Sequence, residues 1–281
     1  MDKKTRDFIY GQVLEYLLDG RTVIYFAESH PSNVMRQISR VMNQKQQQSK
    51  TRHISNKDLH DYVTSGALTV IDSDELYSSI EEPRQEFDVD RLIHSLHTLI
   101  SEARRKRSGR GGSTKRPAGI VAISTGTAYL QAKGIPKLLE YEKELQHGSK
   151  FGSSSVEFIC WHNDPKLFER LPFGSLLSIL NVHDATIHAS WQQRKWDSDT
   201  IFGHVRDGID DVLGSGSAYL IFKTLKMVYR LDPQETISST PELFEEKVTK
   251  ILGERTAQRV FRMIADAIRQ EMMYCEVDDM R

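Results

Sequence analysis

Short apolar runs alternate with amphipathic stretches along the first two thirds of the chain. Runs rich in β-branched and aromatic residues predict buried strands at residues 22–27, 68–71, 119–124 and 156–161. Helical spacing of apolar residues predicts helices between them, at residues 8–18, 58–64, 89–104 and 135–146 and from Pro31 onward. This alternation predicts an α/β fold, a mostly parallel sheet covered by helices on both faces. The Gln- and Lys-rich residues 43–55 are expected to form a loop.

From about residue 195 onward, the spacing of apolar residues is typical of helices alone. Apolar spacing predicts four helices, at residues 201–213, 218–229, 242–252 and 256–273, and no further strand. We therefore expect two domains, an α/β domain over residues 1–194 and an all-helical domain over residues 195–281.

Composition excludes several classes of protein. The 281 residues are 38% hydrophobic and 27% charged, with a net charge of -1, so the chain is not a general polyanion binder. No apolar run approaches the roughly 20 residues that span a bilayer, and residues 1–8 lead into a helix without a signal-peptide core. A cytoplasmic location is therefore expected. Cys160 and Cys275 are the only cysteines, which suggests neither a disulfide framework nor a zinc site, and we expect no metal and no cofactor.

The carboxyl ends of the predicted strands are the best place to look for a ligand site, because small molecules bind there in parallel α/β sheets. The run from 155 to 191 is the most informative, since a strand ending in Trp161 leads into the polar turn His162-Asn163-Asp164-Pro165. Apolar walls with a few polar groups are typical of such pockets, although the same residues could simply cap strands or fill the core. The candidate ligand-binding residues are Tyr25, Glu28, His30, Asp72, Thr125, Thr127, Trp161, His162 and His183.

Two motifs that suggest phosphate or nucleic-acid binding are weak. The sequence GRGGSTK at residues 109–115 follows a helix and precedes a strand, which is the reverse of a phosphate loop, so we predict no ATPase activity. A basic cluster around it could neutralise nucleic-acid phosphates, but it contains no aromatic residue and is more typical of a solvated loop. Its members are Arg104, Arg105, Lys106, Arg107, Arg110, Lys115 and Arg116.

About 190 residues of the chain resemble the MEDS domain, the sensory domain of DcmR-type regulators from methanogens and methylotrophs. The resemblance rests on the order and spacing of six blocks, at residues 14–38, 61–77, 87–103, 135–145, 156–168 and 176–187. It implies a RecA/KaiC-like fold without a working phosphate loop and a role in sensing small molecules or other signals. The chain departs from the family in starting at the helix that follows the family's first strand, and in reading Ser-Thr-Gly-Thr at residues 124–127, where an acidic residue is usual.

Residues 205–264 are similar to a helical output domain found in archaeal signalling proteins, the Nitrosopumilus output domain family. Together the two resemblances imply an intracellular regulator, not an enzyme, whose α/β domain senses a small molecule or a protein partner and whose helices transmit the response. The alternatives are a DNA-binding transcriptional regulator and an enzyme that uses a cleft at the strand ends. The apolar segments 218–222 and 260–264 also predict self-association as a homodimer.

Overall fold

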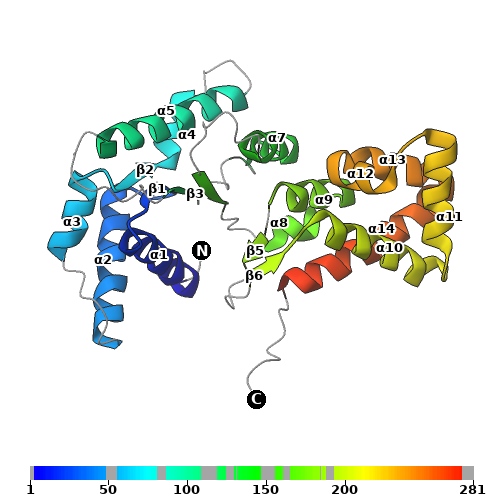
Figure 1. Cartoon of the computed structure of the whole chain (residues 1–281), viewed down its shortest axis with the longest axis horizontal. Coiled ribbons are helices and arrows are strands. Elements are labelled where there is room, and N and C mark those ends of the chain that lie inside the picture. Colours follow the sequence, from blue (N-terminus) through cyan, green and yellow to red (C-terminus); the bar gives the residue numbers. More distant parts are fainter. Residues whose placement is uncertain are drawn as a thin grey trace. The chain divides into compact units, whose positions relative to one another are not determined.

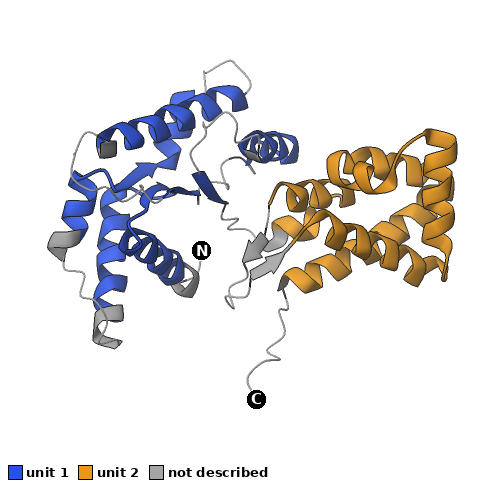
Figure 2. Cartoon of the chain, in the orientation of Figure 1, with its two compact units in different colours: residues 1–164 blue, residues 165–281 orange. Residues whose placement is uncertain are grey.

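The computed structural model describes two compact units, residues 1–164 and 165–281 (Figure 2). The described residues are 3–48, 56–80, 87–108, 119–124, 130, 132–146, 156–160, 165–183, 185–187 and 193–273. The expected division at residues 194/195 therefore differs from the observed one by some thirty residues, because two helices of the expected α/β domain pack with the C-terminal helices. Each unit is described separately below.

The first unit alternates helices and strands, as the apolar pattern predicts (Figure 1). Its strands are β1 (Thr22–Ala27), β2 (Leu68–Asp72), β3 (Ile120–Ser124) and β4 (Val156–Cys160). Its helices are α1 (Lys3–Leu18), α2 (Pro31–Gln48), α3 (Asn56–Thr64), α4 (Ser73–Ile80), α5 (Val89–Ser108) and α7 (Ile135–Gln146).

The strands of this unit form a four-stranded sheet of order β2-β1-β3-β4 within the described residues, and every neighbouring pair is parallel. Register places Tyr25 of β1 beside Val70 of β2 and Ile123 of β3. The chain leaves β1 toward β2 and then crosses to the other side at β3, so strand order reverses between β1 and β3. In open parallel sheets, this switch point is where ligands bind, outside the carboxyl ends of the strands.

Alternating side chains of β1 point to opposite faces, and helices cover both (Figure 1). Val23, Tyr25 and Ala27 join one core cluster with buried residues of α1 and α2. Ile24 and Phe26, the intervening residues, are also buried. All six residues of β1 are buried, which explains why its sequence is a continuous apolar run and not an alternating one.

Two expectations for this unit were wrong in detail. Helix α2 continues to Gln48 and so takes up part of the expected loop at residues 43–55. Helix α4 was not expected at all, because Asp72 and the two residues that follow it read as a turn. Asp72 instead starts the helix, since its carboxylate Oδ1 accepts the backbone N–H groups of Asp74 (3.0 Å) and Glu75 (3.3 Å).

The second unit is mainly helical. Its helices are α8 (Pro165–Arg170), α9 (Phe173–Val182), α10 (Ser198–Leu213), α11 (Ser217–Thr224), the π-helical turn η2 (Leu225–Tyr229), α12 (Pro233–Ser239), α13 (Pro241–Leu252) and α14 (Glu254–Met273). The short strands β5 (Ala185–Ile187) and β6 (Gln193–Lys195) pair antiparallel. The apolar segment that follows His183 therefore forms a strand that pairs with β6 and not with the parallel sheet, and α12 is a helix that the apolar pattern did not predict.

Helix α9 is the centre of this unit, since residues 173–180 are all buried. The ring of Phe173 stacks on Phe261 of α14 with centroids 4.7 Å apart. Toward α13, the backbone N–H of Gly174 donates to Glu245 Oε2 (2.8 Å), and Ser178 Oγ donates to Glu242 Oε1 (2.7 Å). These contacts explain why α9 belongs to the helical unit.

Among the described residues, no helix has the length and apolar character needed to cross a membrane.

Candidate functional site

A hollow of about 360 Å³ lies at the carboxyl end of β1, between α1 and α2. Its inner wall includes Tyr25, which leaves β1 at the face covered by α1, and Tyr10 of α1; both are at most 4% exposed. Polar side chains line the rest: Arg6 from α1, Glu28 and Ser29 from the loop after β1, and Asn33 and Gln37 from α2. The hollow thus combines a buried aromatic wall with a cation, a carboxylate and two amides near the β1/β3 switch point.

The two tyrosines form a coupled pair. Their ring centroids are 5.9 Å apart, with the planes tilted by 54°. Burial raises the pKa of Tyr10, while its hydrogen bond to Tyr25 and the positive charge of Arg6 act in the opposite direction. Because burial has the larger effect, the hollow presents a neutral phenol beside a guanidinium. Such a pair suits a ligand that carries a hydrogen-bond acceptor or a negative charge.

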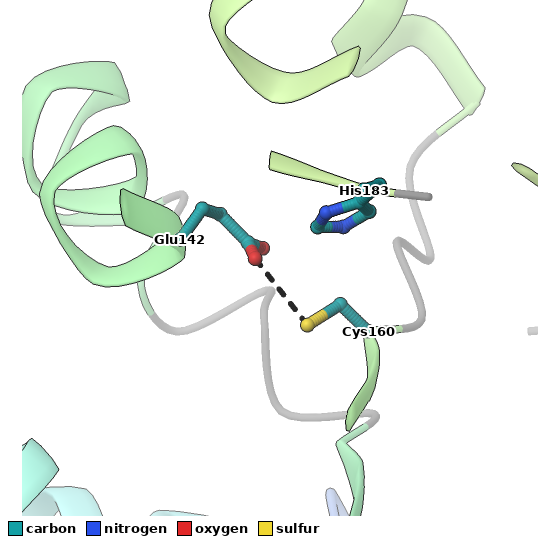
Figure 3. A group of neighbouring side chains, drawn as sticks. All are labelled: Glu142, Cys160 and His183. Atoms are coloured by element: carbon teal, nitrogen blue, oxygen red, sulfur yellow. Dashed lines mark hydrogen bonds between the residues drawn. The ribbon is translucent and has the colours of Figure 1, made fainter. Parts of the chain in front are cut away.

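Buried polar side chains gather beneath the carboxyl ends of β3 and β4. We call the buried residues Tyr77, Ser124, Tyr141 and Glu142, together with the partly buried Cys160, the buried polar cluster. Cys160 ends β4 and donates from Sγ to Glu142 Oε2 of α7 at 3.3 Å (Figure 3). Glu142 is only 1% exposed. The phenols of Tyr77 and Tyr141, from α4 and α7, both interact with Ser124 at the end of β3.

In the buried polar cluster, the protonated phenols and thiol surround the carboxylate of Glu142. Burial is the main cause that raises the pKa of Tyr77, Tyr141 and Cys160, and the negative charge of Glu142 raises all three further. A thiol with a raised pKa is a poor nucleophile because the thiolate is the reactive form. The thiol of Cys160 is therefore largely protonated at neutral pH, and the cluster is a polar part of the core. The charge of Glu28 also acts on Tyr77, which places the cluster and the hollow along the same edge of the sheet.

The structure gives two predicted site residues local capping roles. Asp72 caps α4, which is the alternative interpretation of that residue. His30 is exposed and precedes α2, where its Nδ1 accepts the backbone N–H of Ser32 (3.3 Å) and lies 2.8 Å from Ser32 Oγ. Of the predicted ligand-binding residues that the structure describes, Tyr25 and Glu28 line the hollow.

The other predicted ligand-binding residues are not brought to the hollow by the described structure. His183 belongs to the second unit, where it follows α9 and its backbone N–H donates to Leu180 O (3.3 Å). Thr125, Thr127, Trp161 and His162 lie outside the described residues.

The predicted basic cluster is described only in part. Arg105 and Lys106 are exposed in the last turns of α5, whereas Arg104 is partly buried. Arg107 belongs to the same helix, but its side chain is outside the described part of the chain, as are Arg110, Lys115 and Arg116 and the glycine-rich segment between them.

Sequence reasoning missed the helical residues of both groups. Arg6 and Tyr10, like Asn33 and Gln37, are four residues apart and therefore share a helix face, but nothing in the sequence shows that this face meets a strand end. Glu142 had a clearer signal. It lies four residues after Leu138 and three before Leu145, both buried, so an acidic side chain interrupts the apolar face of α7.

Comparison with known proteins identifies no relative: the chain matches no protein-family model, no curated protein and no solved structure. Its function is therefore inferred from the residues and their geometry.

Proposed function

We propose that the chain is a signal-sensing regulator whose first unit binds a small polar molecule in the hollow at the carboxyl end of β1. The observation that carries this proposal is the hollow itself, where Tyr10 and Tyr25 form a buried wall beneath Arg6, Asn33 and Gln37. Its place beside the β1/β3 switch point supports ligand binding on general grounds. In this proposal the first unit has a RecA/KaiC-like, MEDS-type fold, and the helical unit transmits the response.

The proposal requires the ligand to favour one conformation over another, because a ligand with equal affinity for both shifts no equilibrium. It assigns no catalytic step to the hollow. Among the described groups near the strand ends, Asp72 and His30 have capping roles, and the pKa values of Cys160 and of Tyr77 on α4 are raised. We therefore expect binding without turnover of the bound molecule.

A thermal-shift screen of metabolites tests the proposal, using the full chain and two matched variants. Arg6→Gln changes the cation at the hollow, and Arg40→Gln makes the same change at an exposed position of α2 that does not line the hollow. A ligand at about 100 times its Kd should stabilise the parent by about 2.7 kcal/mol. We expect Arg6→Gln to lose most of this shift and Arg40→Gln to keep it. A compound that shifts the parent and both variants equally would place its site elsewhere.

A DNA-binding regulator is the second candidate. The observation that favours it is a row of exposed cations on α14, where Arg255, Arg259 and Arg262 occupy successive turns. Such a row can neutralise phosphates, and binding would then weaken steeply with salt. A gel-shift series in increasing salt distinguishes the two candidates: replacement of the three arginines by Gln should abolish a DNA shift but leave a metabolite-induced thermal shift intact.

A further inference from the structure

The helix formed by α11 and η2 carries an apolar surface that faces solvent. Tyr219, Leu220, Met227 and Val228 are 64%, 63%, 64% and 66% exposed, respectively. The core-facing side of the same helix is separate, with Ala218, Ile221 and Leu225 buried. We call the four exposed residues the α11–η2 face. Large exposed apolar groups gathered on one helix commonly mark an interaction surface.

The geometry of the helix places these residues together. Tyr219 and Met227, like Leu220 and Val228, are eight residues apart, which is slightly more than two α-helical turns. The second half of the helix is π-helical and winds with more residues per turn, which keeps Met227 and Val228 on the side of Tyr219 and Leu220. The other segment expected to associate does not offer such a surface, because Val260, Phe261 and Ile264 are buried and Met263 is its exposed member.

Two lysines beside the α11–η2 face have partners within the same chain. Lys223 Nζ lies over the ring of Tyr219, 5.7 Å from its centroid. Lys226 Nζ pairs with Asp232 Oδ2 at 3.0 Å. Thr224, midway along the face, donates its hydroxyl to Leu220 O (2.8 Å). An identical surface therefore meets a neutralised Lys226 and a satisfied Thr224 hydroxyl group, while Lys223 keeps its charge over the Tyr219 ring.

We propose that the α11–η2 face is a homodimer interface in which two copies of the helix pack antiparallel about a two-fold axis. The axis passes near Thr224, so that Leu220 of one copy packs on Val228 of the other, and the reverse contact follows by symmetry. The four side chains expose roughly 400–500 Å² in each copy. With the surrounding residues, two copies bury an area near the lower limit of about 1,200 Å² for specific interfaces, which corresponds to a reversible dimer.

Light scattering on the full chain tests this arrangement. At about 200 µM the parent should have twice the mass of one chain, since a small interface corresponds to a micromolar Kd. Leu220→Lys and Val228→Asp should each give monomers, because each variant buries two like charges. Met263→Lys, at the exposed position on α14, is the matched control and should stay dimeric. Thermal melts followed by circular dichroism confirm that each variant is folded.

The double variant Leu220→Lys/Val228→Asp tests the antiparallel register directly. The positive charge introduced at position 220 of one copy then faces the negative charge introduced at position 228 of the other, so the dimer should form again. A monomeric parent overturns the proposal, and so does a dimer that survives both single variants. If the parent is monomeric but sediments with phosphatidylserine vesicles, and Val228→Asp abolishes this, the face binds a membrane and the dimer proposal is wrong.

Discussion

Cys160 shows how burial and a neighbouring carboxylate together lower the reactivity of a thiol. Burial raises the pKa of its thiol, and the charge of Glu142 and the hydrogen bond to it raise that pKa further. At a fixed pH below the pKa, each unit by which the pKa rises lowers the fraction of thiolate about tenfold. In a Cys275→Ser background, we therefore expect iodoacetamide to modify Cys160 at pH 8 at least about tenfold more slowly in the folded chain than in urea.

The contribution of Glu142 can be separated from that of burial. Glu142→Gln removes the negative charge, so the pKa of Cys160 should fall and alkylation of the folded chain should become faster than in the parent. Glu140→Gln, on the same helix, removes an exposed carboxylate that pairs with Lys137 at 3.2 Å and should change nothing. The rate is measured from pH 7 to 10. Equal profiles for all three chains would show that Glu142 does not act on the thiol.

Substitution of two glycines of α10 by alanine is expected to change the stability of the chain in opposite directions. A Cβ at Gly208 would lie 2.5 Å from Ile264 Cγ1 of α14, whereas a Cβ at Gly203 meets nothing within 4 Å. Ile264 is fully packed, with 1% exposure, so it has little room to move. Gly208→Ala should destabilise the chain, since overpacking costs about 1–3 kcal/mol and the gain in helix propensity offsets only about 1 kcal/mol.

Gly203→Ala is the control because it gains the same helix propensity without a clash. We expect it to stabilise the chain by about 0.5–1 kcal/mol. Urea unfolding followed by circular dichroism measures both variants. A stabilised Gly208→Ala would mean that α10 and α14 are not in close contact at this position.

The strands and long helices could be predicted because each leaves a strong local pattern. β1 was predicted to the residue, since a β-branched run between Gly20 and the polar residues after Ala27 has one reasonable interpretation. α7 was predicted equally well. α4 and α12 were missed because each is at most eight residues long and is capped by a preceding Asp that also suits a turn, Asp72 or Asp232.

The candidate site was less predictable than the elements. Tyr25 and Glu28 were found because they lie at a strand end, and strand ends are visible in the sequence. Arg6 and Tyr10 were not found, since their position depends on how α1 crosses the sheet. Tertiary packing decides this crossing, and no local pattern records it.

For the whole molecule, the assignment of α9 decides where the second unit begins. α9 is apolar nearly all round, a pattern that fits a buried helix in either unit. Its observed partners lie on α13 and α14, through Gly174, Ser178 and Phe173. α8 is tied to α14 as well, because Arg269 donates from Nε to Phe168 O (2.7 Å) and from Nη2 to Leu171 O (3.1 Å).

These contacts predict the smallest fragment that folds. Residues 165–281 keep both helices with their partners and should unfold cooperatively on their own. Residues 195–281, the division expected from the apolar pattern, lose α9 and leave Phe261 without Phe173 and Glu245 without the Gly174 N–H. Phe→Ala truncations alone cost about 3–5 kcal/mol in cores, and loss of the whole helix removes far more apolar contact. We therefore expect the shorter fragment to lack a cooperative transition. Thermal melts of the two fragments, followed by circular dichroism, decide the matter: equal cooperative melts would show that α8 and α9 are dispensable for the helical fold.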